Sequence, residues 1–299
     1  MLRALLRTTL YEWTDALRSR RALVTLALYI VAAGGTMYWA ISLLGKIEAE
    51  LLTVLQLPAT EKTGIVATTL WKSEPFQNIM RGALRNTAVY DDLFGIHPVI
   101  LIYGFLVFIY MPLLTVLVAA GRIPEEVASG SVRYAVVRTT RAVWVLGKFL
   151  GQLSMIALAI AGSALAAYLV ARFRLGHYAP PDLLVDMAFW GAKAWVYSVP
   201  FIGLVMGLSL LTRSVGKSTL FGIIGIVACS VITALATFLR SDTLWRQCLG
   251  VLAGLLPNDY EMLLWRSAPR PLLTGAAFLL TLGFAYLALG YLSFRKRDL

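Results

Sequence analysis

The stretch GRIPEEVASGSVRYAVVRTTRAVWVLGK, residues 121–148, is a polar interruption between two long apolar runs. The run before it, 99–120, and the run after it, 149–171, are each long enough to cross a bilayer as a helix. Apolar residues recur through the interruption at helical spacing, with five Lys and Arg side chains among them. The pattern predicts a short amphipathic helix, a turn near 138–141 and the start of a further helix, all at a membrane surface.

The composition places the whole chain in a membrane. Hydrophobic residues make up 59% of the 299 residues, charged residues only 14%, and the mean hydropathy is +0.75. Soluble domains carry about 25% charged residues. We therefore expect an all-α integral membrane protein, built as one domain over 1–299. Six apolar runs are long enough to be transmembrane helices: 22–44, 99–120, 149–171, 188–211, 219–239 and 272–294.

Three further segments are expected to be helical without spanning. Residues 1–21 place Leu and Trp on one helical face and Arg elsewhere, which is typical of an amphipathic helix lying in the membrane interface. The run 244–256 is too short to span, and we interpret it as a partly re-entrant segment before the sixth span. The loop 45–98 is long and contains two amphipathic pieces, 47–57 and 76–84, so it is expected to carry a function of its own.

The distribution of charge predicts the orientation. Six spans leave both termini on the same side as the 121–148 stretch. That side carries 15 Lys and Arg against 5 Asp and Glu, whereas the other side carries 11 of each. The positive-inside rule therefore predicts cytoplasmic termini and a cytoplasmic 121–148 loop, in the plasma or inner membrane of the cell. The net charge of +11 is thus an orientation signal, and we expect no nucleic-acid partner.

The chain shows little sign of catalysis. Gly216-Lys217-Ser218-Thr219 resembles the end of a phosphate-binding loop, but Leu211 stands where that motif needs its first glycine. The expected spans contain no Asp, Glu or His, which disfavours an intramembrane protease or a proton-coupled pump. The two histidines lie 80 residues apart, without cysteine companions that would indicate a metal site. We predict no catalytic residue, no metal and no cofactor in this chain.

Lys193 is the only charged residue within an expected span. It lies near the outer end of its helix, so it is expected to extend outward to water. The alternative is a cationic contact for an anionic headgroup, which makes Lys193 the one weak candidate for substrate binding. Glycine pairs four residues apart allow helices to approach closely, although such pairs also arise by chance. They are Gly147 with Gly151, Gly203 with Gly207, and Gly250 with Gly254.

The polar stretch also resembles a known family. Its pattern is Glu126, three residues and then GSVR at 130–133, followed by an arginine pair at 138 and 141 and by Gly-Lys as the next span begins. This is similar to the cytoplasmic loop of the type-2 ATP-binding-cassette (ABC) transporter permeases. Ser131 stands where threonine is common, and Thr140-Arg141 stands where Ser-Arg is usual. The amphipathic start, the six spans and the segment before the sixth span resemble the same family.

The resemblance implies a membrane subunit that does not hydrolyse ATP itself. A separate ATPase subunit would hold ATP and Mg²⁺ and would receive the coupling helix of the 121–148 loop. A second permease chain, identical or a paralogue, would complete the pathway within the lipid. The residues that the resemblance assigns to ATPase coupling are Glu125, Glu126, Gly130, Ser131, Arg133, Arg138, Arg141, Gly147 and Lys148.

Several functions stay open at this point. The acid-free spans favour export of a hydrophobic, lipid-like or peptide cargo over a small cation. Within the same family, the chain could instead be a mechanotransmitting permease, which passes conformational energy to an extracytoplasmic partner docked on loop 45–98 without moving cargo. From another class, a membrane-embedded enzyme acting on lipid, or a scaffold, is the alternative.

Overall fold

The computed structural model describes residues 2–54, 71, 74, 77, 92–175, 182–238 and 244–296, and every regular element assigned there is a helix. The long helices are α2 (Arg20–Val54), α6 (Pro98–Ala119), α9 (Arg141–Leu175), α10 (Leu183–Ser209), α11 (Val215–Phe238) and α14 (Pro269–Arg295). The shorter ones are α1 (Leu2–Arg18), α7 (Arg122–Ser129), α8 (Ser131–Arg138), α12 (Leu244–Ala253), the 3₁₀ turn η2 (Pro257–Tyr260) and α13 (Glu261–Leu264).

The expected all-α membrane architecture is confirmed. In the described part of the chain, six helices are long and apolar enough to cross a membrane. Pro112 and Pro200 lie inside α6 and α10, and both helices continue through them. This agrees with the tolerance for proline in helices that are surrounded by other helices.

Two helices are longer than the apolar runs indicate. Helices α2 and α9 each have 35 residues, or about 50 Å at 1.5 Å per residue, so they extend beyond a hydrocarbon core of about 30 Å. Helix α2 continues past the expected end at residue 44, and α9 begins before the expected start at 149. The first part of the expected loop 45–98 is therefore helical. Most of the rest of that loop, including nearly all of the amphipathic piece 76–84, lies outside the described residues.

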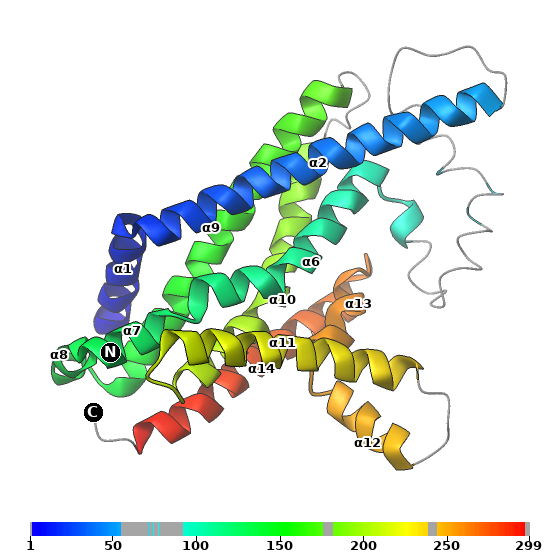
Figure 1. The fold of residues 1–299 in the computed structure, drawn as a ribbon. Helices are drawn as coiled ribbons and strands as arrows, with labels where there is room; N and C mark the ends of the chain where they lie inside the picture. Colours follow the sequence, from blue (N-terminus) through cyan, green and yellow to red (C-terminus); the bar gives the residue numbers. More distant parts are fainter. Residues whose placement is uncertain are drawn as a thin grey trace.

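Helix α10 is the centre of the bundle. Of its most apolar window, 72% is buried, against 22% for α2 and 11% for α11. It packs against α14, α6, α9 and α11 (Figure 1). The apolar faces of α2 and α11 are instead turned outward, where lipid or another polypeptide covers apolar side chains in a membrane.

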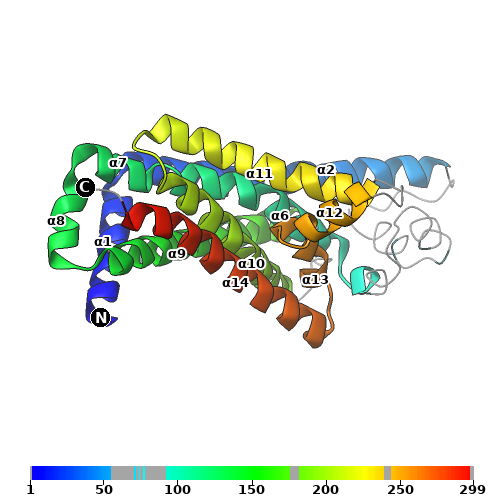
Figure 2. The same cartoon turned by 90° about the horizontal axis from the view of Figure 1, so that it is seen from below.

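The short helices gather at the two ends of the bundle. Figures 1 and 2 show α1, α7, α8, the start of α9 and the end of α14 together at one end. Helices α12 and α13 lie toward the other end. In both views α1 crosses the first end at a steep angle to the long helices, which is the arrangement expected for a helix in the membrane interface.

Glycines allow α10 and α14 to approach until their backbones touch. A Cβ on Gly207 would lie 2.6 Å from the carbonyl oxygen of Tyr286, and one on Gly203 would overlap the carbonyl of Gly283. The pair Gly203 and Gly207 is therefore a packing motif. Gly250 and Gly254 are not, because no atom outside their own helix comes within 4 Å of a Cβ at either position.

We expect Gly207→Val to destabilise the protein, because the new side chain would meet the backbone of α14, which cannot move aside as a side chain can. Overpacking of this kind costs about 1–3 kcal/mol. Thermal unfolding in detergent measures the effect as a lower midpoint. Gly35→Val is the matched control, since a Cβ at this exposed position in α2 meets nothing within 4 Å. Equal midpoints for the two variants would contradict the tight crossing.

Candidate functional site

The segment between the second and third spanning helices folds into two short helices, α7 and α8, called here the α7–α8 segment. Between them Gly130 has a φ of 73°, a left-handed conformation that favours glycine. One continuous amphipathic helix was the expectation, and the break at Gly130 corrects it. The expected turn near 138–141 is present, because Thr139 is extended and α9 begins at Arg141 with Thr140 Oγ1 accepting from the Val143 N–H at 3.3 Å.

A buried group of three charged residues joins this segment to the rest of the bundle. The Lys148 Nζ in α9 donates to Glu12 Oε1 in α1 and to Glu126 Oε1 in α7, each at 2.5 Å. The exposed side-chain fractions are 1% for Lys148, 4% for Glu12 and 26% for Glu126. Glu126 also accepts a hydrogen bond from Trp144 Nε1 at 3.2 Å. We call Lys148, Glu12 and Glu126 the buried triad.

The burial of these charges makes the three helices depend on one another. Removing one partner from a buried ion pair leaves a charge without compensation and costs far more than losing a surface pair. An ammonium group has three donors and no acceptor, so Lys148 needs oxygen partners wherever it is shielded from water. Helix α1 supplies one of them and α7 the other. If either helix moved away from the start of α9, Lys148 would lose one of its two carboxylate partners.

Helix α1 lies directly on α9 at two glycines. A Cβ on Gly147 would lie 2.6 Å from the Cβ of Thr8, and one on Gly151 would lie 2.7 Å from the Cβ of Glu12. Trp13 Nε1 donates to Ser154 Oγ one turn further along. Gly147 and Gly151 therefore form the surface of α9 on which α1 packs, and not a crossing between two spanning helices.

Other contacts connect the same end of the bundle. Arg122 at the start of α7 forms an ion pair of 2.9 Å with Asp15 of α1. Arg141 donates to the carbonyl oxygen of Arg295 at the end of α14, also at 2.9 Å. Trp144 stacks on Phe294 with ring centroids 5.8 Å apart. The α7–α8 segment, α1, α9 and the end of α14 thus form one connected unit.

The outer face of α8 is exposed and mixes apolar with basic side chains. Tyr134 and Val137 are exposed by 80% and 87%, and Arg133 and Arg138 beside them are also exposed. A tyrosine, an aliphatic group and arginines are typical of a contact surface for another protein. We call these four residues the α8 face.

The residues proposed for coupling therefore divide into groups. Glu126 and Lys148 belong to the buried triad, Gly147 contacts α1, and Gly130 forms the turn. Glu125, Ser131, Arg133 and Arg138 are exposed, and Arg141 is half-buried against α14. Lys148 does not reach the surface of this chain, so any part that it takes in coupling is through the triad.

Sequence reasoning missed Glu12 and Trp144. The available signal was the face of α1 that carries Thr8, Glu12 and Ala16 at helical spacing, opposite a glycine pair on α9. A carboxylate between small residues on one helical face is typical of a charge that is buried against a neighbouring helix and paired there with a cation. Only the fold shows that this cation is Lys148.

Lys193 does not extend outward to water, contrary to the simpler expectation. It is 6% exposed, and its Nζ lies 4.3 Å from the Trp190 ring centroid and 4.7 Å from that of Phe189. It also donates to the carbonyl of Arg266 at 3.4 Å. The cation–π contacts lie within α10, and the hydrogen bond to Arg266 connects α10 to the segment before α14. Its role as a substrate contact stays a prediction.

A half-buried carboxyl, that of Glu261 in α13, lies outside the spans. Glu261 Oε2 accepts from the Tyr197 hydroxyl at 3.2 Å, and burial raises the pKa of the Glu261 carboxyl above its usual value. His97 caps α6, accepting from the Val99 N–H at 3.3 Å. Within the described part of the chain, no group of three or more His, Cys, Asp or Glu residues could hold a metal ion. His177 lies outside the described residues.

A comparison with families of known proteins shows which family the chain resembles. The family described as "ABC-2 family transporter protein" matches residues 9–299, almost the whole chain. No curated protein matches the chain.

We expect Lys148→Met to lower the free energy of unfolding by about 3–5 kcal/mol, because it leaves the buried carboxylate of Glu12 and the half-buried one of Glu126 without their cation. Unfolding by SDS in mixed micelles measures the change. Asp15→Asn is the control. It removes an ion pair at the same end, but Asp15 is 52% exposed, so the loss should stay below about 1 kcal/mol.

The double variant Lys148→Met with Glu12→Met tests the cause. Replacing a buried pair by apolar groups of similar volume commonly restores stability. The double variant should therefore be more stable than Lys148→Met alone. If Lys148→Met is no more damaging than Asp15→Asn, the triad does not hold this end together.

Proposed function

The chain belongs to the ABC-2 family of transporter proteins, and we propose that it couples ATP hydrolysis on a separate subunit to export of a hydrophobic, lipid-like or peptide cargo. It is a multi-pass membrane protein and a permease subunit of an ABC transporter, a transport component rather than a catalyst. Members of this family generally work with a separate ATPase subunit. ATP and Mg²⁺ would bind there.

The observation that carries the proposal is the connection of the exposed α8 face to the spanning helices. The α7–α8 segment leads directly into α6 on one side and α9 on the other. The buried triad ties it to α1 and to the first turns of α9. A force applied by a partner at Tyr134 and Val137 would therefore move these helices together rather than bend a loop.

The charge of the α8 face indicates the chemistry of its partner. Arg133 and Arg138 flank the two exposed apolar side chains, so the complementary surface would be an apolar groove with acidic residues at its rim. With the termini and the α7–α8 segment cytoplasmic, as the positive-inside rule predicts, this surface would face a soluble ATPase.

The outward apolar faces of α2 and α11 support a second permease chain. Their apolar windows are only 22% and 11% buried, the lowest of the six spanning helices. Two chains paired along these faces would enclose a pathway lined mainly by apolar groups, which suits an apolar cargo. A homodimer and a pair of paralogues are equally compatible with this arrangement.

One observation favours the mechanotransmitting alternative. Helix α2 extends to Val54, well beyond the length needed to cross the hydrocarbon core. A rigid extension of the first span could carry motion from the membrane to an extracytoplasmic partner on loop 45–98. The distinguishing measurement is cargo: a mechanotransmitter hydrolyses ATP without moving any molecule across the bilayer.

We expect the double variant Tyr134→Ala with Val137→Ala to weaken binding of the ATPase subunit by about tenfold or more, because central apolar contacts dominate protein interfaces. Binding is measured by titrating the purified ATPase onto the permease in nanodiscs. ATPase stimulation by the permease should fall in parallel. Phe173→Ala is the control, since Phe173 is 84% exposed at the other end of α9. Unchanged affinity in the double variant would remove the α8 face from the interface.

The orientation is tested by labelling single cysteines in intact cells. Cys248 is exposed near the opposite end and is first replaced by serine. We expect a membrane-impermeant maleimide to label Phe173→Cys and to leave Val137→Cys unlabelled until the cells are opened. The reverse pattern would place the α7–α8 segment outside and contradict an ATPase at this surface.

A further inference from the structure

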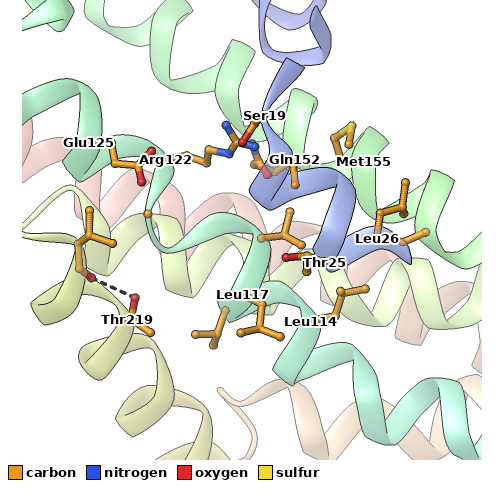
Figure 3. Close-up of a pocket in the computed structure, with 16 residues that line it drawn as sticks. Ser19, Thr25, Leu26, Leu114, Leu117, Arg122, Glu125, Gln152, Met155 and Thr219 are labelled. Atoms are coloured by element: carbon orange, nitrogen blue, oxygen red, sulfur yellow. Dashed lines mark hydrogen bonds between the residues drawn. The ribbon is translucent and has the colours of Figure 1, made fainter. Parts of the chain in front are cut away.

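A pocket of about 210 Å³ lies beside the α7–α8 segment, at the level where α2 begins and α6 ends. Helices α2, α6, α7, α9 and α11 contribute to its walls, together with Ser19, which lies between α1 and α2 (Figure 3). Its lining changes from polar to apolar. Ser19, Arg122, Glu125 and Gln152 lie on one side of the view, and Leu26, Leu114 and Leu117 extend away from them.

Gln152 is the unusual member of this lining. It is only 1% exposed, yet its Oε1 atom has no hydrogen-bond partner. Leaving a buried amide oxygen unsatisfied costs free energy, and such atoms are rare in folded proteins. Gln152 lines the pocket together with Ser19 and Arg122 (Figure 3). A ligand that donates a hydrogen bond in this pocket would satisfy the oxygen.

The lining of the pocket contains one basic and one acidic side chain. The Arg122 side chain, 14% exposed, supplies a guanidinium that already binds Asp15 through one nitrogen and has further donors. Glu125 of the same helix supplies a carboxylate to the same lining. A ligand that matches both would carry an anionic and a cationic group, with an N–H donor on the cationic one.

The position of the pocket indicates a ligand from the membrane. Leu117 lines it and is also 60% exposed, so the pocket adjoins the outward apolar surface of the bundle. Its volume is below the range of about 300–1,000 Å³ that encloses a whole small molecule. A headgroup would fit inside, while the acyl chains would remain outside, along the apolar face of α6.

We propose that this pocket binds the phosphoethanolamine headgroup of a membrane lipid, with the phosphate on Arg122 and the ammonium donating to Gln152 Oε1 and toward Glu125. A phosphocholine headgroup has the same two charges, but its trimethylammonium has no N–H to donate. A phosphoglycerol headgroup can donate from its hydroxyls, but it lacks the positive charge that Glu125 favours. The site therefore distinguishes three common headgroups by hydrogen bonding and charge.

The experiment uses the full chain in nanodiscs of phosphatidylethanolamine, phosphatidylcholine and phosphatidylglycerol in equal parts. Native mass spectrometry after partial delipidation counts which lipid stays bound. We expect phosphatidylethanolamine to be retained about tenfold over phosphatidylcholine, the ratio expected for one hydrogen bond to a charged group. Gln152→Met, which keeps the length of the side chain, should abolish this preference.

Two further variants separate recognition from structural damage. Gln152→Glu keeps an acceptor oxygen and adds a negative charge, so it should retain or strengthen the preference for phosphatidylethanolamine. Thr281→Val is the control, because its exposed hydroxyl bonds only to the Ala277 carbonyl of its own helix. It should behave as the wild type. The thermal midpoint of each variant shows whether it is folded.

Three outcomes would overturn the proposal. Equal retention of phosphatidylethanolamine and phosphatidylcholine by the wild type would mean that Gln152 is satisfied by water. Preference for phosphatidylglycerol would mean that only the guanidinium recognises lipid. Competition by soluble glycerophosphoethanolamine at the concentration of the lipid would identify a soluble ligand. None of these measurements involves the ATPase, so this proposal and the coupling proposal fail independently.

Discussion

The ammonium group of Lys148 is held between two carboxylates at a point where three helices meet. One carboxylate comes from the interfacial helix α1 and the other from α7, and all three side chains are largely shielded from water. Because a buried charge without a partner is costly, this one contact makes the placement of α1 and of the α7–α8 segment interdependent. Gly147 and Gly151 of α9 allow α1 to pack closely, and the Trp144–Phe294 stack joins α9 to α14.

The rest of the bundle is organised by how closely its helices can approach. Helices α10 and α14 touch through backbone atoms because glycines face one another at the crossing. In a membrane, where lipid is as apolar as leucine, this close packing replaces the hydrophobic effect as the force between helices. The tight core around α10 leaves α2 and α11 at the periphery with their apolar faces outward. That asymmetry agrees with the proposed pairing with a second permease chain.

The proposed coupling surface and the proposed lipid site adjoin the same unit. The α8 face lies at the end of the bundle. The pocket with Gln152 is lined in part by α7, including Arg122, which pairs with Asp15. A lipid headgroup in that pocket would contact the helix that connects the exposed face to the second span. Membrane composition and the cytoplasmic partner would then act on neighbouring parts of one element.

The sequence by itself determined the class, because apolar length and charge asymmetry are properties of single segments. It predicted six spans, a helix before the first of them and a polar helical segment at 121–148, and all of these are present as helices. It could not separate two short helices at Gly130, since a glycine is compatible with both a helix and a turn. Only the tertiary structure decided three features: which residues pair with Lys148, that Lys193 is buried, and that the Gln152 Oε1 atom has no hydrogen-bond partner. Glu12 and Lys148 are separated by 136 positions, and only the packing of α1 on α9 brings them together.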